Sequence, residues 1–342
     1  MYPPCSILIL GCYGNVGRRI TQLLLETSSY HLVLVGKNHQ RLVELVDTLK
    51  VMKGYFPKRI SIYCFDMFDL NLLNNIIKQV NLVLVTASIS SVFLQIAELS
   101  MANNCHYIDL WYSPAISLLF KQKFSQNYQS KSIILTQAGL QPGLPALLAR
   151  FLLDTIRKDE IVYIKIASFI KVDWEQLALS KSTLIEIREH FQPLIYKNGV
   201  WKSFNTILPC YQLFDFGENI GFKYCKPVYL EEIAELVLLL SNIRSAGFYV
   251  EEHYACSFPP PHLTRMKVVI DKVIDKRLRR QSLWITHQDS LFITAASVIA
   301  SIKQVLAERQ IPPGYHISAM VLDPIQFVKD LQDFGIVVEK LP

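Results

Sequence analysis

The sequence of 342 residues lacks several features that would assign it to a common class. It has no uninterrupted apolar run of the roughly 18–20 residues that a transmembrane helix requires. Its seven cysteines are scattered, without a C-x-x-C pair or a histidine at metal-ligand spacing, so a disulfide framework and a metal site are not expected. The amino terminus has no basic leader and no small-residue cleavage site. We therefore expect a cytoplasmic protein that carries no metal.

Charged residues are also few, at 19%, whereas hydrophobic residues make up 51% of the chain. This composition excludes a disordered or low-complexity chain. A chain of this length outgrows a single hydrophobic core, so two domains are expected. The mean hydropathy of +0.25 is high for a chain without a membrane span, and a large buried subunit interface would account for it. We therefore predict a homodimer.

The formal net charge of +6 arises entirely in the first part of the chain. Residues 1–150 contain 13 Lys and Arg against 7 Asp and Glu, whereas residues 151–342 contain 22 of each kind. The excess is dispersed and forms no dense basic stripe, so we expect a small polyanion as the ligand and no nucleic acid. The one basic cluster, Lys276 to Arg280, is predicted to be the solvated end of a helix.

Over the first 136 residues, short apolar runs alternate with helix-length amphipathic segments. The predicted strands span residues 6–10, 31–36, 60–65, 81–85, 106–109 and 132–136. The predicted helices span residues 15–26, 39–51, 70–79, 90–103 and 114–127. The strands are apolar on both faces, which is typical of a parallel sheet covered on both sides. Because parallel neighbours need crossover helices, we predict an α/β fold, a Rossmann doubly wound sheet in a domain of residues 1–147.

The pattern changes after residue 147. Ile161 to Ile170 and Ala246 to Phe258 are predicted to be long strands, and Tyr196 to Trp201 has Asn-Gly between β-type residues, a strong hairpin signal. Residues 148–287 are therefore predicted to form a second, α+β domain with a mainly antiparallel sheet. This domain is expected to bind the substrate and to form the dimer interface.

The C-terminal region is expected to return to the first domain. Residues 289–309 contain no Gly or Pro, and apolar residues recur at 291, 295, 298, 302 and 305. This spacing predicts a long helix with one apolar stripe, which needs a partner surface. We therefore predict that residues 288–342 pack on the Rossmann domain.

The clearest motif is the glycine loop Gly11-Cys12-Tyr13-Gly14-Asn15-Val16-Gly17, which directly follows the first predicted strand. Glycines here allow a tight turn, let a diphosphate approach without meeting a Cβ atom, and let the helix pack on the strand. The start of the following helix then faces the phosphates with N–H groups and a positive dipole. The residues expected to bind a dinucleotide here are Gly11, Tyr13, Gly14, Asn15, Val16 and Gly17.

The end of the second strand indicates which dinucleotide binds. A site for NAD usually has Asp or Glu about 20 residues after the loop, where it binds the ribose hydroxyls. Residues 36–41, Gly-Lys-Asn-His-Gln-Arg, contain no carboxylate, whereas Lys37 and Arg41 could neutralise a 2′-phosphate and Asn38 lies between them. This pattern favours NADP (NADPH) over NAD. The alternative is that Lys37 is a solvated loop residue and that selectivity is loose.

Other candidate residues follow the ends of later strands, because α/β sheets bind ligands at that edge. Asp66 follows the third strand and could approach the adenine. Asp109 ends the fifth strand and could orient a substrate nitrogen or move a proton; alternatively, it caps the segment Trp111 to Pro114. The residues expected near the nicotinamide are Thr86, Ala87 and Ser88, after the fourth strand, and Gly139, Gln141, Pro142 and Gly143, after the sixth.

Four segments in order resemble the saccharopine dehydrogenase-like oxidoreductases, which include saccharopine reductase and carboxynorspermidine dehydrogenase. They are ILGCYGNVGRR, VLVGKNHQRL, NNCHYIDLWYSP and ILTQAGLQPGLPALLARFLL. The resemblance is weaker in the second half, where it includes Ser182 and Thr183. It implies a Rossmann domain with an inserted substrate domain, and NAD(P)-dependent reduction of an imine formed from an amine and a carbonyl compound.

The leading hypothesis is therefore an NADPH-dependent reductase of a C=N bond, with Asp109 and Gln141 as catalytic candidates. The substrate-binding candidates are Pro142, Gly143, Ser182, Thr183 and Tyr224. One alternative keeps the cofactor and changes the bond to C=O or C=C. Another is an NADP-binding sensor or scaffold without turnover, because Gln141 and Ser182 differ from the acidic residue and the glycine that the relatives often have.

Overall fold

The computed structural model describes residues 5–87, 92–111, 113–124, 130–153, 160–174, 192–204, 211–253, 256–307 and 311–341. By their contacts the residues form two compact units, Met1–Gly139 with Thr294–Val321, and Leu140–Ile293 with Leu322–Pro342. This division lies at residue 139 rather than 147, and it assigns only part of the C-terminal region to the first unit. As functional domains, the boundaries at 147 and 288 stay a prediction.

The first unit contains a seven-stranded parallel sheet in the order β15-β6-β5-β4-β1-β2-β3, so the predicted Rossmann fold is confirmed. The strands are β1 (Ser6–Leu10), β2 (His31–Gly36), β3 (Ile60–Cys64), β4 (Leu82–Val85), β5 (His106–Asp109), β6 (Ile133–Thr136) and β15 (Gly314–Ile317). The helices are α1 (Asn15–Thr27), α2 (His39–Lys50), η1 (Pro57–Arg59), α3 (Leu70–Ile77), α4 (Phe93–Ala102), α5 (Pro114–Phe124), α9 (Ser290–Leu306, from Thr294 in this unit) and α10 (Ser318–Val321).

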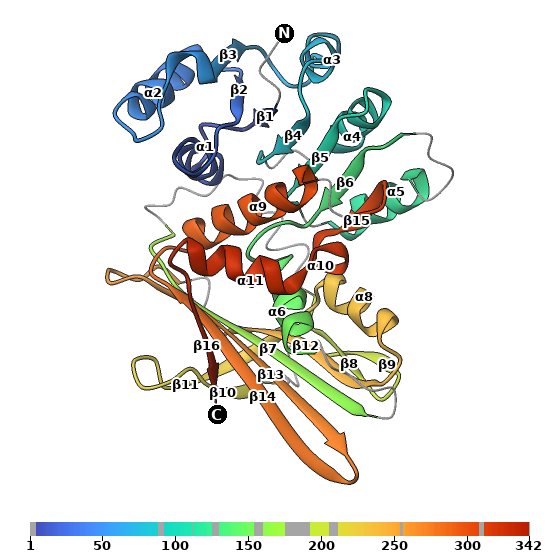
Figure 1. Ribbon diagram of the computed structural model, residues 1–342. Helices are drawn as coiled ribbons and strands as arrows, with labels where there is room; N and C mark the ends of the chain where they lie inside the picture. The colour runs from blue at the N-terminus through green and yellow to red at the C-terminus, as the bar shows by residue number, and fades with distance from the viewer. Residues whose placement is uncertain are drawn as a thin grey trace. The chain divides into compact units, whose positions relative to one another are not determined.

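The core of this unit follows from the apolar runs of the sequence. Every residue of β1, β2, β4 and β6 is buried, as expected for strands covered on both faces. Helices α1 and α2 lie on one side of the sheet and α3, α4 and α5 on the other (Figure 1). The short strand β15 was not predicted, because its four residues include Gly314 and follow two prolines.

Helix α9 differs from the prediction in its burial. The sequence predicted one apolar stripe, yet residues 295–302 are all buried, including the two serines Ser297 and Ser301. A helix that is buried all round lies in the core rather than on a surface. Small residues on the second side allow neighbouring elements to approach closely. In the described part of the chain, no helix combines the length and the hydropathy that a membrane crossing requires.

The second unit is built on a nine-stranded sheet with the path β10-β11-β12-β7-β13-β14-β16, and β8 and β9 attached to β12. Its strands are β7 (Ile161–Lys171), β8 (Leu194–Lys197), β9 (Val200–Ser203), β10 (Gln212–Asp215), β11 (Phe222–Val228), β12 (Ile243–Glu251), β13 (Leu263–Ile274), β14 (Arg277–His287) and β16 (Val337–Leu341). Its helices are α6 (Leu144–Leu153), α8 (Glu231–Leu239) and α11 (Pro324–Asp333). Only the pair β7–β12 is parallel among these ladders, so the predicted mainly antiparallel sheet is confirmed.

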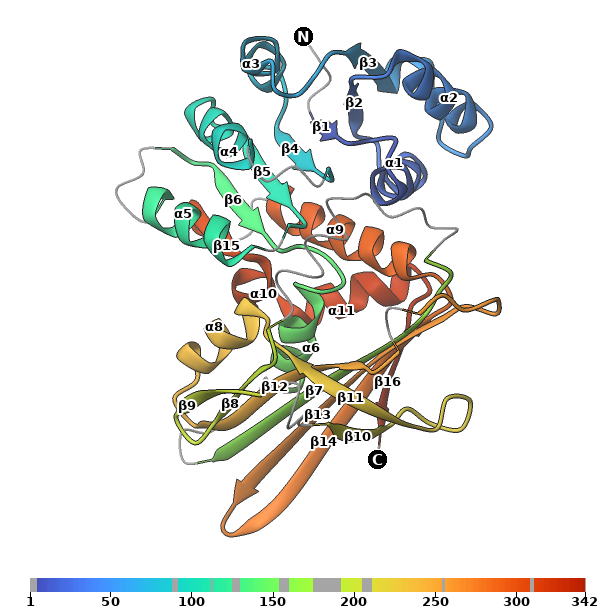
Figure 2. The same ribbon diagram turned by 180° about the vertical axis from the view of Figure 1, so that it is seen from behind.

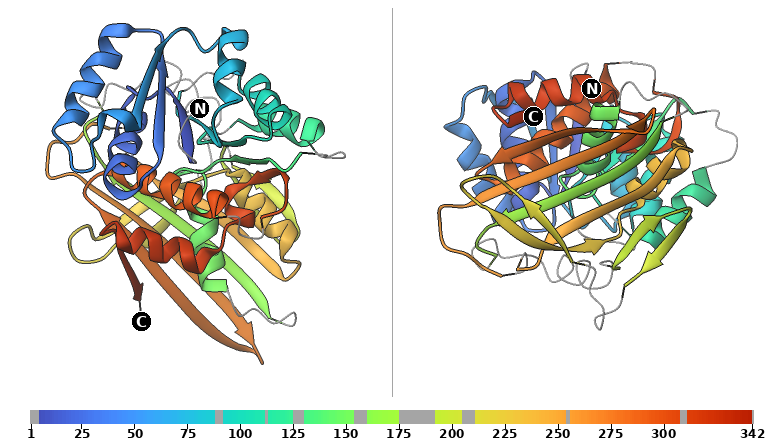
Figure 3. Two further views of the ribbon diagram at one scale, coloured as in Figure 1. Left: turned by 45° about the horizontal axis from the view of Figure 1, so that its top comes forward. Right: turned by 90° about the horizontal axis from the view of Figure 1, so that it is seen from below.

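One face of this sheet is covered by α6, α8 and α11, and the right panel of Figure 3 views the sheet from the opposite face. The burial of strand β13 reflects this cover on one face, because its residues alternate between buried and half-buried along its length. The predicted hairpin is confirmed as β8–β9, with φ of 53° at Asn198 and 88° at Gly199.

Two predictions in this unit are wrong. The cluster from Lys276 to Arg280 is not a helix end; it forms the turn and the start of β14 in the long β13–β14 hairpin. Positive φ at Asp275 (48°) and Lys276 (64°) makes that turn. The strand predicted from Ala246 to Phe258 instead spans Ile243–Glu251, so it begins earlier and ends before the prolines.

Candidate cofactor and active site

Glycines 11 and 17 turn the chain between β1 and α1 where no side chain fits. Gly11 has φ of 84°. A Cβ atom at Gly11 would lie 2.8 Å from the backbone nitrogen of Ala87, and one at Gly17 would lie 2.2 Å from the carbonyl oxygen of Gly11. Gly14 donates its N–H to that carbonyl at 3.0 Å. The loop is thus closely packed between β1 and the end of β4, as the sequence predicted for a phosphate-binding turn.

The start of α1 is suited to an anion. Gly14 is the N-cap residue in an extended conformation, no side chain caps the helix, and no acidic residue lies in its first turn. Asn15 is exposed and Val16 is half-buried there. A helix N-terminus presents N–H groups and a partial positive charge, which stabilise a diphosphate. The strand order reverses between β1 and β4, and ligands bind at such reversals in open α/β sheets.

Two cations follow β2 where an NAD site has a carboxylate. Lys37 and Arg41 are exposed, and neither forms an ion pair within the described residues. Asn38 caps α2, because its Oδ1 accepts the backbone N–H of Arg41 at 3.0 Å. The guanidinium of Arg41 lies 5.8 Å from the centroid of the Tyr13 ring. The structure therefore brings Tyr13 of the glycine loop and Arg41 of α2 together beside the end of β2.

Thr86 and Ala87 form the other wall of the loop. The Oγ1 of Thr86 donates to the carbonyl of Leu10 at 2.9 Å, which ties the end of β4 to the end of β1. Ala87 is the residue that a side chain at Gly11 would meet. Both predicted residues therefore border the loop, while Ser88 lies outside the described residues.

The remaining cofactor candidates, Asp66 and Gly139, differ in their exposure to solvent. Asp66 is exposed after β3, and its Oδ1 accepts the backbone N–H of Phe68 at 3.2 Å, so it stabilises its own turn. Gly139 is buried after β6.

Cys12 lies inside the glycine loop and is buried. Its Sγ is 3.5 Å from the carbonyl oxygen of Val35, and burial raises the pKa of its thiol to about 12. It is therefore a packing residue.

Asp109 lies at the carboxyl end of β5 with both carboxylate oxygens engaged. Tyr107 donates its hydroxyl to Oδ2 at 2.8 Å, and Oδ1 accepts the backbone N–H groups of Trp111 at 3.1 Å and Gln137 at 3.4 Å. The contact to Trp111 is the capping interaction that the sequence left open as the alternative. A catalytic role for Asp109 stays a prediction.

Burial has the largest effect on the pKa of the Asp109 carboxyl group. Asp109 is 2% exposed. Loss of solvent raises its pKa from 3.8 to about 7, against the opposing effect of its three hydrogen bonds. The indole Nε1 of Trp111 is also buried, and no described residue accepts its hydrogen. Buried donors are seldom left unpaired, so Trp111 is a candidate ligand contact that the sequence did not predict.

The family comparison matches this region. The model for the saccharopine dehydrogenase NADP-binding domain matches residues 7–138, from β1 to just beyond β6. Residues 7–138 are therefore similar to a saccharopine dehydrogenase NADP-binding domain. This finding confirms the predicted resemblance and the predicted cofactor, NADP. Which residues hold NADP stays a prediction, supported by the glycine loop and by the two cations after β2.

Solved structures share the fold across nearly the whole chain. Apo saccharopine dehydrogenase (L-Glu forming) from Saccharomyces cerevisiae has a TM-score of 0.75 at 10% identity, over 99% of this chain and 100% of that chain. An engineered D-amino acid dehydrogenase bound to NADP+ has a TM-score of 0.52 at 10% identity, covering 97% and 99%. The C. glutamicum DAP dehydrogenase in complex with DAP has a TM-score of 0.52 at 11% identity, covering 96% and 98%. No curated protein sequence matches this chain.

In the second unit, the predicted loop of Gln141, Pro142 and Gly143 precedes α6. The N–H of Gly143 donates to Oε1 of Glu232 at 2.8 Å, and that of Ala146 donates to Oε2 at 3.1 Å. Glu232 is fully buried and caps α6, and burial raises its pKa to about 7. No sequence pattern indicates this contact, because 89 residues separate Gly143 and Glu232.

Gln141 retains an unused acceptor. Its Oε1 is buried, and no described residue donates a hydrogen bond to it. The other predicted substrate residues are less informative, because Ser182 and Thr183 lie outside the described residues. Tyr224 is 60% exposed on β11, directly opposite Leu213 of β10. It therefore lies on a surface rather than in a pocket.

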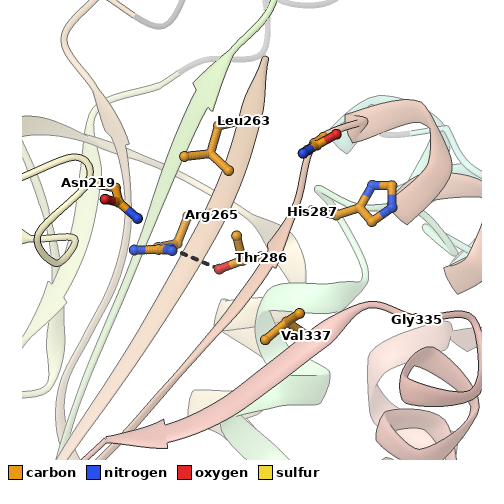
Figure 4. Close-up of a pocket in the computed structure, with 8 residues that line it drawn as sticks. Asn219, Leu263, Arg265, Thr286, His287, Gly335 and Val337 are labelled. Carbon is orange, nitrogen blue, oxygen red and sulfur yellow. Dashed lines mark hydrogen bonds between the residues drawn. The ribbon is translucent and has the colours of Figure 1, made fainter. Parts of the chain in front are cut away.

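A pocket of about 380 Å³ lies within the second unit beside Arg265 of β13 (Figure 4). The Nε of Arg265 donates to Oγ1 of Thr286 at 2.8 Å, Nη1 donates to the carbonyl of Phe216, and the guanidinium lies 4.3 Å from the Trp284 ring centroid. His287, at the pocket edge, points away from Arg265. These contacts hold Arg265 in place within the unit, and none of the described substrate candidates, Pro142, Gly143 and Tyr224, lines this pocket.

Proposed function

We propose that this chain is an NADPH-dependent oxidoreductase that reduces a C=N bond formed from an amine or amino acid and a carbonyl compound. The observation that carries the proposal is the NADP-binding domain, whose glycine loop and cations lie at the ligand edge of the sheet. The same edge holds a buried carboxyl group, Asp109, and a buried donor, Trp111.

The chemistry that this reaction needs is modest. When bound, the reduced nicotinamide supplies a hydride. A protonated imine is already electrophilic, so the protein has mainly to position the substrate and to exclude water. Asp109, with a pKa raised to about 7 by burial, can hold a proton at neutral pH. The free Oε1 of Gln141 can accept a hydrogen bond from a substrate N–H.

Oxidation of NADPH, followed by its absorbance, tests the reaction. A panel of 2-oxo acids, aldehydes and enoyl compounds is offered with and without primary amines and amino acids. Consumption that requires both partners supports imine reduction. Consumption with the carbonyl compound or with an enoyl compound alone would replace it by C=O or C=C reduction. Binding of NADPH without consumption across the panel would favour a sensor or scaffold.

We further propose that two copies of the chain pair through the β10–β11 hairpin of the second unit. Leu213 and Tyr224 are opposite each other and Phe222 lies on the same face, with exposed fractions of 54%, 60% and 68%. Strand β10 is an edge strand of the sheet path (Figure 2). An exposed apolar face beside an unpaired edge strand is prone to aggregate unless another protein surface buries it. Light scattering should give about twice 39.3 kDa for the wild type, and Leu213→Glu should give the monomer.

The expected setting is cytoplasmic, with a small-molecule substrate as the main partner. Six cysteines in the described part of the chain are all free thiols, and two of them, Cys64 and Cys256, are exposed. Unpaired exposed thiols fit a reducing compartment. Fractionation of cells that express the chain, followed by detection of the protein in the soluble fraction, tests this location.

A further inference from the structure

Tyr13 occupies an unusual place for a side chain of a glycine loop. Its ring lies against the backbone of Gly36, the last residue of β2: a Cβ atom at Gly36 would be 2.2 Å from Cε1 of Tyr13. Gly36 is buried beneath the ring. The glycine at this position is therefore required by Tyr13 and not by a turn, because Gly36 is an ordinary strand residue.

The other neighbour of the Tyr13 ring is Arg41. Its guanidinium lies 5.8 Å from the ring centroid, within the range of a cation–π interaction. Its backbone is fixed by Asn38, but within the described residues no acceptor or anion engages its guanidinium. The ring is thus the one described group that restricts where this long, exposed side chain points.

Tyr13 and Arg41 lie beside the end of β2, where a coenzyme phosphate can bind. In dinucleotide-binding folds the end of the second strand faces the adenine ribose, and an arginine there accommodates the 2′-phosphate of NADP. A free arginine loses rotamer entropy when it binds a phosphate, and a side chain that is already held in place loses less. An aromatic ring that holds Arg41 at the end of β2 would therefore strengthen binding of the phosphorylated coenzyme selectively.

We propose that Tyr13 is a specificity-determining residue, a platform on Gly36 that positions Arg41 for the 2′-phosphate of NADP. The inference rests on the cofactor site and not on the reaction proposed above. It is tested by coenzyme binding alone, so a failure to find imine reduction would leave it intact. The measured quantities are the dissociation constants of NADPH and NADH for the full chain, from calorimetric titration.

Tyr13→Leu should raise the dissociation constant of NADPH about fivefold and change that of NADH less than about twofold, since an exposed cation–π contact has about this effect. Tyr13→Phe keeps the ring and should bind both coenzymes as the wild type does. Gly36→Ala should reproduce the loss of Tyr13→Leu, because its methyl group displaces the ring, and should add nothing in the Tyr13→Leu background.

Arg41→Gln provides the decisive control. If Tyr13 acts through Arg41, Tyr13→Leu has no further effect on NADPH binding in the Arg41→Gln protein. Melting temperatures and NADH binding verify that each variant is folded. An equal loss for NADPH and NADH in Tyr13→Leu would make the ring a general wall of the adenosine site and overturn the proposal. Loss of the preference in Tyr13→Phe, or additive losses with Arg41→Gln, would overturn it as well.

Discussion

The buried carboxyl group of Asp109 predicts how the stability of the chain changes with pH. In the unfolded chain its pKa is near the ordinary 3.8, whereas in the folded protein burial raises it to about 7. Between these pH values the folded state holds a proton that the unfolded state has lost. The contribution of Asp109 to the free energy of unfolding therefore falls as the pH rises from about 4 to about 7 and is constant above that range.

The magnitude follows from the size of the shift. One pKa unit corresponds to about 1.36 kcal/mol, so a shift from 3.8 to about 7 destabilises the folded protein by about 4 kcal/mol at pH 8, relative to pH 4. Asp109→Asn removes this titration. Its amide oxygen can still accept the N–H groups of Trp111 and Gln137, and its amide nitrogen can donate to the hydroxyl of Tyr107.

Urea unfolding of both proteins between pH 4.5 and 8, followed by tryptophan fluorescence, measures the effect. The difference in stability between the two proteins should be smallest at pH 4.5, closest to the pKa of the unfolded state, and Asp109→Asn should become the more stable as the pH rises. Asp69→Asn is the matched control for the removal of a carboxyl group, because Asp69 is exposed and its Oδ1 accepts the N–H of Leu72 as the cap of α3. Equal pH dependence in wild type and Asp109→Asn would refute the argument from burial.

Three further predictions concern the cofactor loop and the capping of α6. Gly17→Ala should abolish NADPH binding, because its Cβ would lie 2.2 Å from the carbonyl of Gly11; retained affinity in a titration would contradict the packing of the loop. Lys37→Asp should shift the ratio of NADPH to NADH affinity toward NADH by about tenfold, since an anion replaces a cation beside the 2′-phosphate; an unchanged ratio would exclude Lys37 from the site. Glu232→Ala should lower the free energy of unfolding by about 1–3 kcal/mol at pH 5, where a pKa raised to about 7 keeps the buried carboxyl group uncharged, because the N–H groups of Gly143 and Ala146 would lose their acceptor. Chemical denaturation that gives wild-type stability would argue against this cap.

The Rossmann fold could be predicted because its information is local. Each predicted strand from 6–10 to 132–136 overlaps an observed one, and the ends differ by at most one residue. Continuous apolar runs, crossover-length helices and the glycine loop are properties of neighbouring residues in the chain. The loop geometry followed for the same reason, since it depends on glycines three residues apart.

The second unit was harder to predict because its elements depend on distant partners. In the β13–β14 hairpin, strand β14 begins in a run of basic residues that favoured a helix end, and these residues form a strand because they pair with residues 271–274 of β13. In the first unit, helix α9 was predicted to have one buried face, but its residues 295–302 are all buried. Burial depends on the whole fold, so periodicity within one segment underestimates it.

The sequence alone determined the α/β pattern of the first unit and predicted a site for a phosphorylated dinucleotide at the first crossover, because the glycine loop and the residues after the second strand lie within about 30 consecutive positions. Tertiary structure decided the surroundings of individual side chains. It placed the Tyr13 ring between Gly36 and Arg41, raised the pKa of Asp109 to about 7 and paired Glu232 with the start of α6. Desolvation and long-range contacts exist only after the chain has folded, and no spacing of residues encodes them in advance.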